Sequence, residues 1–396
     1  MAVAGEWRVA SSLTGSDDSR GLPLAVRIVV APDKFKGSLT AIEAYGAIAS
    51  GIWAAAPDVT CSTFAMADGG EGTADVLRMK GCERVEHAVT GPLPWLQAKG
   101  EIVLLDDGES AILDMASAAG FSLLTETQRD PTLTTTFGVG ELIKHAIGLG
   151  RKRILVGLGG SATCDGGLGA AQALGLQLQL DGKPLTRPPT GADLAKVTAI
   201  SPPDSKLDVE IICLCDVDNP LVGPNGAAPT FAPQKGATPE QVQQLDAGLM
   251  NIAGLSRANP CAAHTGAAGG LAFGLGMAVP TTMTPGAAFI ADYLELNKSL
   301  ANADLCFTGE GRFDETSLGG KVTAEVAKRA KAGGVRCVVL AGAVTEADGM
   351  HNAGVTAAFS IVPRAMVLEE ASARASELLA RTAEQAMRLF LAGRAK

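Results

Sequence analysis

The sequence predicts an α/β fold of two domains, in which a discontinuous, doubly wound, mostly parallel sheet domain carries an inserted mixed α/β domain. Near both ends of the chain, short apolar runs alternate with helical patterns, which is typical of a mostly parallel sheet. The middle of the chain is less regular and contains hairpin-like pairs of strands. A chain of 396 residues also exceeds what one hydrophobic core usually holds, so two domains are expected.

The domain boundaries are placed where the regular alternation stops and where it resumes. Residues 27–75 and 285–396 are predicted to form one Rossmann-like α/β domain, with residues 76–284 as the inserted α/β domain. Residues 1–26 are polar, include several acids and lack the hydrophobic core of a signal peptide. They are therefore predicted to be a disordered extension.

The first regular part starts with an apolar run, which predicts a strand buried on both faces. Thr40 and Glu43 have the spacing of a capping box, so a helix is expected to begin there. The predicted elements are a strand at 27–30, a loop at 31–39, a helix at 40–55, a strand at 62–67 and an acidic glycine loop at 68–72, followed by another helix.

The inserted part is predicted to mix hairpin strands with helices. Turn signals at Gly91-Pro92 and at Asp106-Asp107-Gly108 separate short alternating runs, as in antiparallel strands. Its strands are predicted at 85–90, 97–105, 111–115, 154–156, 176–180 and 209–214, and its helices at 137–149, 168–174 and 239–252, with one more opened by 266–270.

Regular alternation returns in the last part of the chain. Two apolar runs there are each followed by small residues, which is the pattern of a buried strand leading into a turn. The predicted elements are strands at 304–307, 337–340 and 357–362 and helices at 321–332 and 369–391.

The composition argues against several classes of protein. A formal net charge of −9, only 4% aromatic residues and the lack of a long basic run disfavour nucleic-acid binding. No apolar run approaches the ~20 residues of a membrane span. The eight cysteines are scattered without the paired spacing of a zinc site, so most are expected to be buried thiols in a reducing, cytoplasmic compartment.

The stretch from Arg153 to Gly175 has the pattern of a strand, a glycine loop and a helix. This arrangement aims backbone N–H groups and a helix N-terminus at an anion, and glycine lets a phosphate approach closely. Cofactor binding is therefore predicted at Gly159, Gly160, Ser161, Asp165, Gly166 and Gly167. The competing interpretation is a structural turn in which Asp165 only caps the helix.

Charged residues recur where predicted strands end, which is where ligands bind in open α/β sheets. The acids are Asp33, Asp68, Glu71, Asp165, Asp216, Asp218, Glu310 and Asp314, and the bases are Lys34, Lys36, Lys235, Arg312 and Lys321. Carboxylates that hold Mg²⁺ and cations that neutralise a transferring group are what phosphoryl transfer requires. For any single acid, the alternative is a cap, a turn or a solvated loop charge.

A second pattern competes with phosphoryl transfer. Gly157, Gly159 and Ala162 follow a strand and Asp181 lies further on, which imitates the fingerprint of an NAD-dependent dehydrogenase of a small hydroxy acid. The match is poor because Asp165 and two glycines interrupt the point where the helix should begin. The G-x-x-x-x-G-K-[ST] motif of P-loop kinases does not occur in the sequence.

Seven longer motifs in the sequence can be compared as a set. They are Ala31–Leu39, Ala67–Thr73, Gly159–Gly167, Cys215–Leu221, Pro233–Ala237, Gly266–Gly270 and Thr308–Arg312. In order and spacing they closely resemble the bacterial-type glycerate kinases, the family that includes the glycerate 2-kinases. The resemblance runs from about Arg27 to the C-terminus, and several long motifs in register are far more specific than any one of them.

The resemblance implies a kinase that phosphorylates D-glycerate with ATP as co-substrate and Mg²⁺ as cofactor. It favours 2-phosphoglycerate as the product, on the strength of the family alone. It also implies a two-domain α/β fold with the site in a cleft between the domains. Neither a nucleic acid nor a membrane is expected as a partner, and a homodimer is the assembly considered.

The expected site residues combine this resemblance with positions at strand ends. Catalytic roles are predicted for Lys36, Asp33, Asp216, Arg312 and Lys321, substrate binding for Asp68, Glu71, Glu310 and Arg312, and metal binding for Asp165 and Asp216. Arg312 is expected to bind the glycerate carboxylate and Lys36 to stabilise the transferring phosphoryl group. The alternative for Arg312 is an ion pair with Glu310 or Asp314 that only braces the loop.

Overall fold

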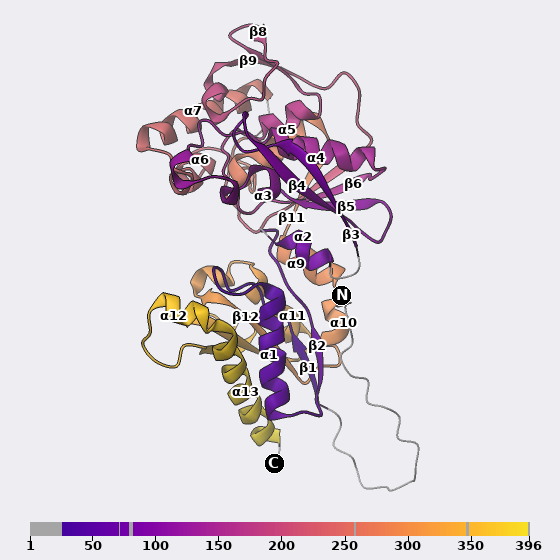
Figure 1. Cartoon of the computed structure of the whole chain (residues 1–396), viewed down its shortest axis with the longest axis vertical. Coiled ribbons are helices and arrows are strands. Elements are labelled where there is room, and N and C mark those ends of the chain that lie inside the picture. Colours follow the sequence, from indigo (N-terminus) through magenta and orange to yellow (C-terminus); the bar gives the residue numbers. More distant parts are fainter. Residues whose placement is uncertain (1–25, 71, 79–81, 257–258, 346–347, 395–396) are drawn as a thin grey trace. The chain divides into compact units, whose positions relative to one another are not determined.

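The computed structural model describes residues 26–70, 72–78, 82–256, 259–345 and 348–394. The chain forms two compact units (Figure 1): unit 1 combines the residues up to Asp68 with those from Ala287 onward, and unit 2 is the continuous stretch Gly69–Gly286. The predicted domain boundaries, after residues 75 and 284, stay a prediction. Almost all of the predicted disordered extension lies outside the described residues.

Unit 1 is built on a five-stranded sheet in which every neighbouring pair of strands is parallel. Its strands, in spatial order, are β14 (Val355–Ser360), β13 (Arg336–Val344), β12 (Leu305–Phe313), β1 (Arg27–Val30) and β2 (Thr60–Thr63). Ile28 of β1 lies level with Leu305 of β12, so strands from the two ends of the chain share one sheet. This is the α/β architecture that the alternating pattern predicts.

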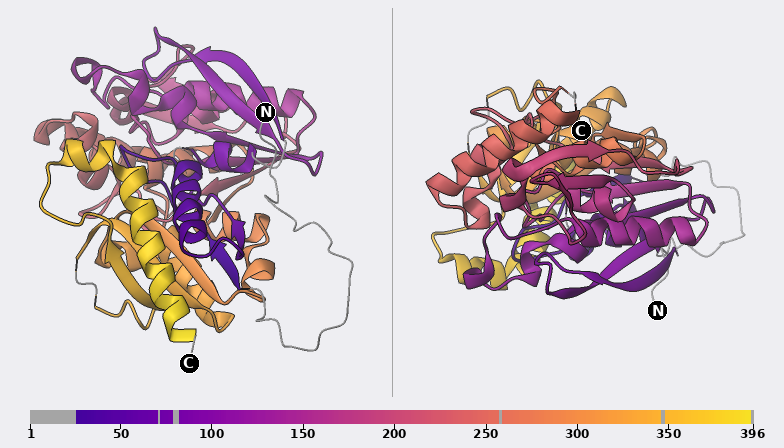
Figure 2. Two further views of the ribbon diagram at one scale, coloured as in Figure 1. Left: turned by 60° about the horizontal axis from the view of Figure 1, so that its bottom comes forward. Right: turned by 90° about the horizontal axis from the view of Figure 1, so that it is seen from above.

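Helices surround this sheet, and the longest is α13 (Ala375–Arg394). It packs against α1 (Ala41–Ala55), and the two helices lie side by side in Figures 1 and 2. Thr40 is the N-cap of α1 and exchanges hydrogen bonds with Glu43, so the predicted capping box is confirmed. The remaining helices are α9 (Gly286–Tyr293), α10 (Leu296–Leu300), α11 (Val322–Ala332) and α12 (Leu368–Ala373).

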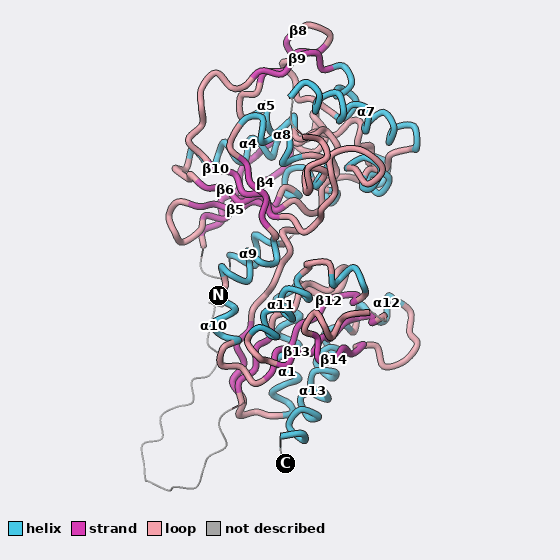
Figure 3. The backbone as a smooth tube through the Cα atoms, turned by 180° about the vertical axis from the view of Figure 1, so that it is seen from behind, coloured by secondary structure: helices cyan, strands magenta, loops and turns pink. Residues whose placement is uncertain are grey.

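Unit 2 contains a six-stranded mixed sheet. Its strands, in spatial order, are β11 (Thr281–Thr284), β10 (Glu210–Leu214), β6 (Arg153–Gly157), β5 (Ser110–Asp114), β4 (Gln97–Leu104) and β3 (Glu83–Thr90). The first four are parallel to one another, and β3 and β4, as well as β4 and β5, pair antiparallel as predicted. Figure 3 shows both sheets from behind, with strands in magenta and helices in cyan.

The sequence pattern missed several short strands of unit 2. The edge strand β11 was not predicted, and a separate three-stranded sheet is formed by β8 (Lys183–Pro184), β7 (Gln177–Leu180) and β9 (Val197–Ser201). Of these three strands, only β7 was predicted. β8 contains two residues and β11 four, all of them polar or proline except one methionine, so neither has an apolar run to reveal it.

The helices of unit 2 pack on both the large and the small sheet. They are α2 (Thr73–Arg78), α3 (Ala116–Ala119), α4 (Phe137–Gly148), α5 (Leu168–Ala173), α6 (Ala227–Phe231), α7 (Pro239–Ser256) and α8 (Leu271–Ala278). Each unit has its own buried apolar core, so each can exclude water without the other. Within the described part of the chain, no helix combines the length and apolarity needed to cross a membrane.

Candidate active site

In unit 1, two of the predicted acids follow strands, and a third lies inside a strand that is longer than predicted, since β12 runs to Phe313 rather than to Phe307. Asp33 follows β1, Asp68 follows β2, and Glu310 belongs to β12, which pairs with β1. The main-chain N–H of Asp33 donates to Gly309 O at 2.9 Å, and Asp33 Oδ1 accepts from Lys34 N at 2.7 Å. These bonds hold the Asp33 carboxylate at the edge of the sheet.

The surroundings of Asp33 disfavour its charged form. Burial raises the pKa of Asp33 to about 7, and the neighbouring carboxylates of Asp68 and Glu310 add to the rise. The N–H and the ammonium of Lys34 act in the opposite direction. A carboxyl group that titrates near neutral pH is suited to accept a proton during catalysis.

Glu310 and Lys321 are close enough to interact electrostatically. Burial raises the pKa of Glu310, while the hydroxyls of Thr323 and Ser317 and the positive charge of Lys321 oppose that rise. Lys321 is half-buried at the N-cap of α11. An acid and a base predicted as site residues are therefore brought together.

Arg312 and Lys36 are exposed cations of unit 1. Arg312 Nε lies 3.0 Å from Asp314 Oδ2, so the ion pair that the bracing interpretation expects does form. The Arg312 side chain is nevertheless 68% exposed. Because most of its side chain is exposed, Arg312 remains accessible to a ligand. Exposed ion pairs of this kind contribute little to stability. Lys36 is exposed in the loop after β1.

In unit 2, the glycine loop follows β6 and its backbone is anchored by neighbouring segments. Gly160 O accepts from Phe121 N at 3.0 Å, and Ala162 N donates to Ala119 O at 2.9 Å. Gly160 has φ 73°, a left-handed conformation that a side chain would disfavour. Gly159 and Gly160 are half-buried and so keep some accessible backbone.

Asp165 is fully buried, and both of its carboxylate oxygens accept hydrogen bonds. Oδ2 accepts from Thr136 N at 2.7 Å, from Thr136 Oγ1 at 2.8 Å and from Gly169 N at 3.2 Å, and Oδ1 accepts from Gly167 N at 3.1 Å. Thr136 is the N-cap of α4 and Gly169 lies in the first turn of α5. The geometry supports the capping interpretation, because Asp165 joins two helix N-termini and has no exposed oxygen for a metal ion.

Gly166 and Gly167 are needed for packing within unit 2. A Cβ at Gly166 would lie 2.3 Å from Ile252 Cδ1, and one at Gly167 would lie 2.4 Å from Leu271 O. Their small size lets α7 and α8 approach the loop, which gives them a role without a ligand. The accessible part of the predicted loop is therefore its beginning, at Gly159 and Gly160.

The side chain of Lys235 places a buried ammonium group against the same loop. The residue is 3% exposed, and its Nζ donates to Ser161 Oγ at 2.7 Å and to Thr163 O at 2.6 Å. Burial lowers the pKa of Lys235 to about 8, and the acidic groups of Cys164 and Asp165 oppose that effect. The loop thus carries a positive charge on its buried side.

Asp216 lies in the loop after β10 and is half-buried. Its Oδ1 accepts from Gly286 N at 2.9 Å. Asp218, in the same loop, is exposed, and its Oδ1 lies 3.2 Å from His264 Nδ1. Of the two acids predicted to bind Mg²⁺, Asp216 is the one that is not fully buried.

Two residues that shape these loops were not singled out from the sequence. Asp114, at the end of β5, accepts hydrogen bonds from Gly72 N at 2.9 Å and from Ala74 N at 3.3 Å. Its position at a predicted strand end was an available signal. Thr136 had none, because its partner Asp165 is 29 residues away. Glu71, predicted to bind substrate, lies outside the described residues.

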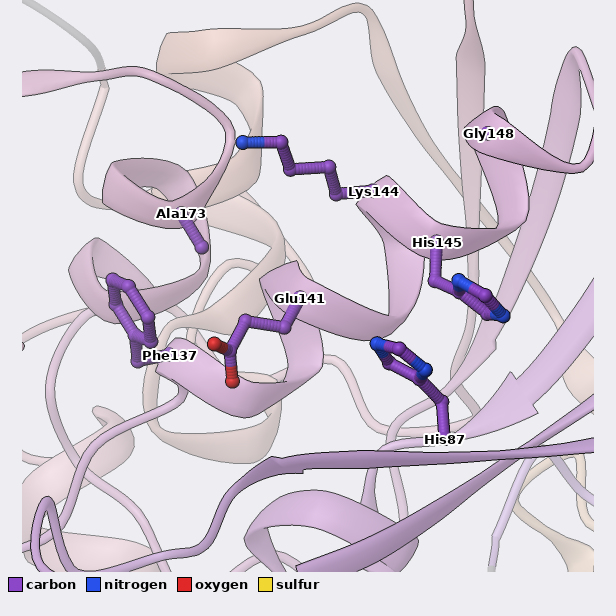
Figure 4. A pocket seen from close by; sticks show the side chains of 7 residues that line it. All are labelled: His87, Phe137, Glu141, Lys144, His145, Gly148 and Ala173. Atoms are coloured by element: carbon purple, nitrogen blue, oxygen red, sulfur yellow. The ribbon is translucent and has the colours of Figure 1, made fainter.

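A separate pocket of about 390 Å³ lies in unit 2 between β3, α4 and α5. Figure 4 shows its lining, which consists of His87, Phe137, Glu141, Lys144, His145, Gly148 and Ala173. The rings of His87 and His145 are stacked, with centroids 3.9 Å apart. None of the predicted site residues lines this pocket.

Comparison with known proteins identifies the family. The model of the glycerate kinase family matches residues 28–391. A glycerate kinase of Haemophilus influenzae is 40% identical over 92% of this chain and 99% of its own, and the glycerate 2-kinase of Escherichia coli is 38% identical over 87% and 93%.

A solved structure agrees with these sequence comparisons. It is a crystal structure of a Salmonella typhimurium LT2 protein described provisionally as glycerate kinase 2. It superposes with a TM-score of 0.80 at 38% identity, covering 94% of this chain and all of that one. The chain belongs to the glycerate kinase family.

Proposed function

We propose that this chain catalyses the ATP-dependent phosphorylation of D-glycerate, with the 2-hydroxyl group as acceptor and 2-phosphoglycerate as product. The observation that carries the proposal is the match to the glycerate kinase family over residues 28–391. The choice of the 2-hydroxyl is supported by the relative named glycerate 2-kinase. The dehydrogenase alternative finds no support in these comparisons.

Asp33 is the proposed general base. The glycerate hydroxyl oxygen attacks the γ-phosphorus of ATP, the bond from that phosphorus to the β–γ bridging oxygen breaks, and ADP leaves. The hydroxyl proton passes to an Asp33 carboxylate oxygen. A pKa of about 7 lets Asp33 be substantially ionised at neutral pH while remaining basic enough to take this proton.

Basic residues of unit 1 are proposed to bind the charged parts of the reactants. Arg312 is exposed and offers a planar set of donors, which suits the glycerate carboxylate. Lys36 is the proposed cation for the transferring phosphoryl group, and Lys321 adds positive charge next to Glu310. Asp68 and Glu310 are proposed to accept hydrogen bonds from glycerate hydroxyls.

The nucleotide is proposed to bind at the start of the glycine loop in unit 2. Gly159 and Gly160 keep accessible backbone, and Ser161 adds a hydroxyl. Asp165, Gly166 and Gly167 are assigned to holding the loop in place, because each is already engaged within unit 2.

The residues present fit a role for Mg²⁺ in which the protein supplies few ligands. Among the described residues, no three acids, histidines or cysteines are grouped to hold a metal ion. Mg²⁺ in kinases is commonly bound through one or two carboxylates together with nucleotide phosphates and water. We assign Asp216 to this role, and the bound ion would neutralise charge on the phosphates.

A coupled assay of ADP release in the presence of Mg²⁺ tests the reaction. ADP release should depend on D-glycerate, and neither lactate nor glycerol should replace it, because each lacks one of the groups that the site is proposed to bind. Equal rates with glycerol would overturn the proposal. Reduction of NAD by the purified protein with glycerate would favour the dehydrogenase instead.

The position of phosphorylation needs a second assay. Coupling through enolase alone detects 2-phosphoglycerate, whereas 3-phosphoglycerate requires added phosphoglycerate mutase. Signal without the mutase is the expected result, and a signal that requires the mutase would assign the 3-hydroxyl group. A homodimer and a cytoplasmic location stay predictions, and sedimentation of the full chain tests the first.

A further inference from the structure

Lys235 is a buried cation that the proposed reaction does not yet use. We propose that Lys235 is a positioning residue, whose ammonium group orients the Ser161 hydroxyl so that Ser161 donates a hydrogen bond to a nucleotide phosphate. This inference rests on the proposed function and adds a residue to the nucleotide site.

The donor and acceptor chemistry fixes the direction of this hydrogen bond. An ammonium group has three donors and no acceptor, so Ser161 Oγ must accept from Lys235 Nζ across their 2.7 Å separation. The hydroxyl hydrogen of Ser161 is then directed away from Lys235 and can be donated to a second group, although only 6% of the residue is exposed. Because this hydrogen lies beside a positive charge, an anion is its most favourable acceptor.

The turn that carries Lys235 is itself fixed by packing. Lys235 ends a 3₁₀ turn, Pro233–Lys235, and the following Gly236 has φ 95°. A Cβ at Gly236 would lie 2.1 Å from Arg129 O, so the turn lies tightly against the main chain there. Because its backbone is constrained, the buried Lys235 side chain has little freedom to leave Ser161.

The loop has other anchors, so the effect of Lys235 can be separated from loop folding. Ala162 N donates to Ala119 O, and Ala162 O accepts from Thr134 Oγ1 at 3.1 Å. These bonds would persist in a variant without the ammonium group. Losing Lys235 also removes its bond to Thr163 O, but these other anchors should keep the loop backbone in place while the Ser161 hydroxyl is released.

Steady-state kinetics and nucleotide binding of four proteins test this inference. They are the wild type, Lys235→Met, Ser161→Ala and the double variant. Lys235→Met and Ser161→Ala should each raise the KM for ATP and the Kd for an ATP analogue by about tenfold, as expected for the loss of a charge-assisted hydrogen bond, with the KM for glycerate unchanged. The double variant should be no worse than Lys235→Met, because the contact from Ser161 to the phosphate is already lost in Lys235→Met.

The control is Lys152→Met, a change at an exposed lysine of the same unit. It should leave both KM values at the wild-type level. Additive losses in the double variant would overturn the inference, as would a Ser161→Ala protein with wild-type nucleotide affinity. If Lys235→Met fails to fold, Ser161→Ala still decides the question. Nucleotide affinity measured without glycerate separates this outcome from a failure of the glycerate kinase assay.

Discussion

Asp33 is the residue whose protonation state should set the pH dependence of the enzyme. As general base it must be ionised, so kcat/KM is expected to rise with pH through about 7. Asp33→Asn should lower kcat ~100-fold or more, since general bases contribute factors of that size. A pH–rate profile of both proteins checks this. Wild-type activity that stays flat across this range would contradict the assignment.

The raised pKa of Asp33 should affect stability in the opposite direction, so that stability falls with pH where activity rises. The pKa of Asp33 is about 7 in the folded chain and ordinarily 3.8, so the folded state binds more protons between those values and stability falls as pH rises through them. Asp33→Asn removes this loss and should raise Tm relative to wild type near pH 8 but not near pH 4. Equal Tm differences at both pH values would show that Asp33 titrates normally.

Asp165 and Asp216 are both predicted from the sequence to bind Mg²⁺, but substitutions at the two positions are expected to have different effects. Asp165→Asn places an amide donor among N–H donors and should cost about 1–3 kcal/mol of stability. Asp216→Asn should instead raise the Mg²⁺ concentration needed for half-maximal rate, with Tm little changed. Thermal unfolding and Mg²⁺ titration of both variants make the comparison. A Mg²⁺ requirement raised only in Asp165→Asn would reverse the assignment.

Substitution of Arg312 distinguishes the two interpretations of its exposed guanidinium group, which are carboxylate binding and bracing of the loop. If it binds the glycerate carboxylate, Arg312→Ala should raise the KM for glycerate about tenfold or more and leave Tm almost unchanged, because its ion pair with Asp314 is exposed. Asp314→Ala, which removes the same ion pair, is the matched control and should preserve the KM. A lower Tm with an intact KM in Arg312→Ala would favour bracing.

At the scale of elements, helix α1 offers a matched pair of glycines. A Cβ at Gly51 would lie 2.0 Å from Ala380 O of α13, so Gly51→Ala should force the helices apart and cost about 1–3 kcal/mol. Gly46 is exposed on the same helix, and a Cβ added there would meet no atom within 4 Å. Gly46→Ala should therefore stabilise the folded protein by up to ~1 kcal/mol. Denaturant unfolding measures both, and similar effects at the two positions would contradict the packing argument.

The elements also show what a sequence can and cannot reveal. Local signals succeeded: the Thr40 capping box and the helix expected at 137–149 are present, the latter as α4. For Asp165 the sequence left two interpretations open, a ligand-binding loop and a helix cap, because the burial of a loop depends on chain segments far away. A glycine loop that binds phosphate and one that packs against helices share the same composition.

At the scale of the whole molecule, the two units have separate cores and different connectivity. Unit 2 is one continuous stretch with its own apolar core, so a fragment spanning residues 69–286 should fold by itself. A cooperative thermal transition of that fragment is the expected result. A fragment that shows no such transition would mean that unit 2 needs the rest of the chain.

The position of β1 has a consequence for biosynthesis. The main-chain N–H of Arg27 bonds to Asp304, 277 residues later, and β1 is flanked by β12 on one side. On the ribosome, β1 can therefore pair with β2 early, but it emerges long before β12 exists, whereas every described strand of unit 2 is synthesised before β12. The edge of β1 that faces β12 must stay unpaired throughout that interval, and closure of the unit 1 sheet is expected to be the late, slow step of maturation.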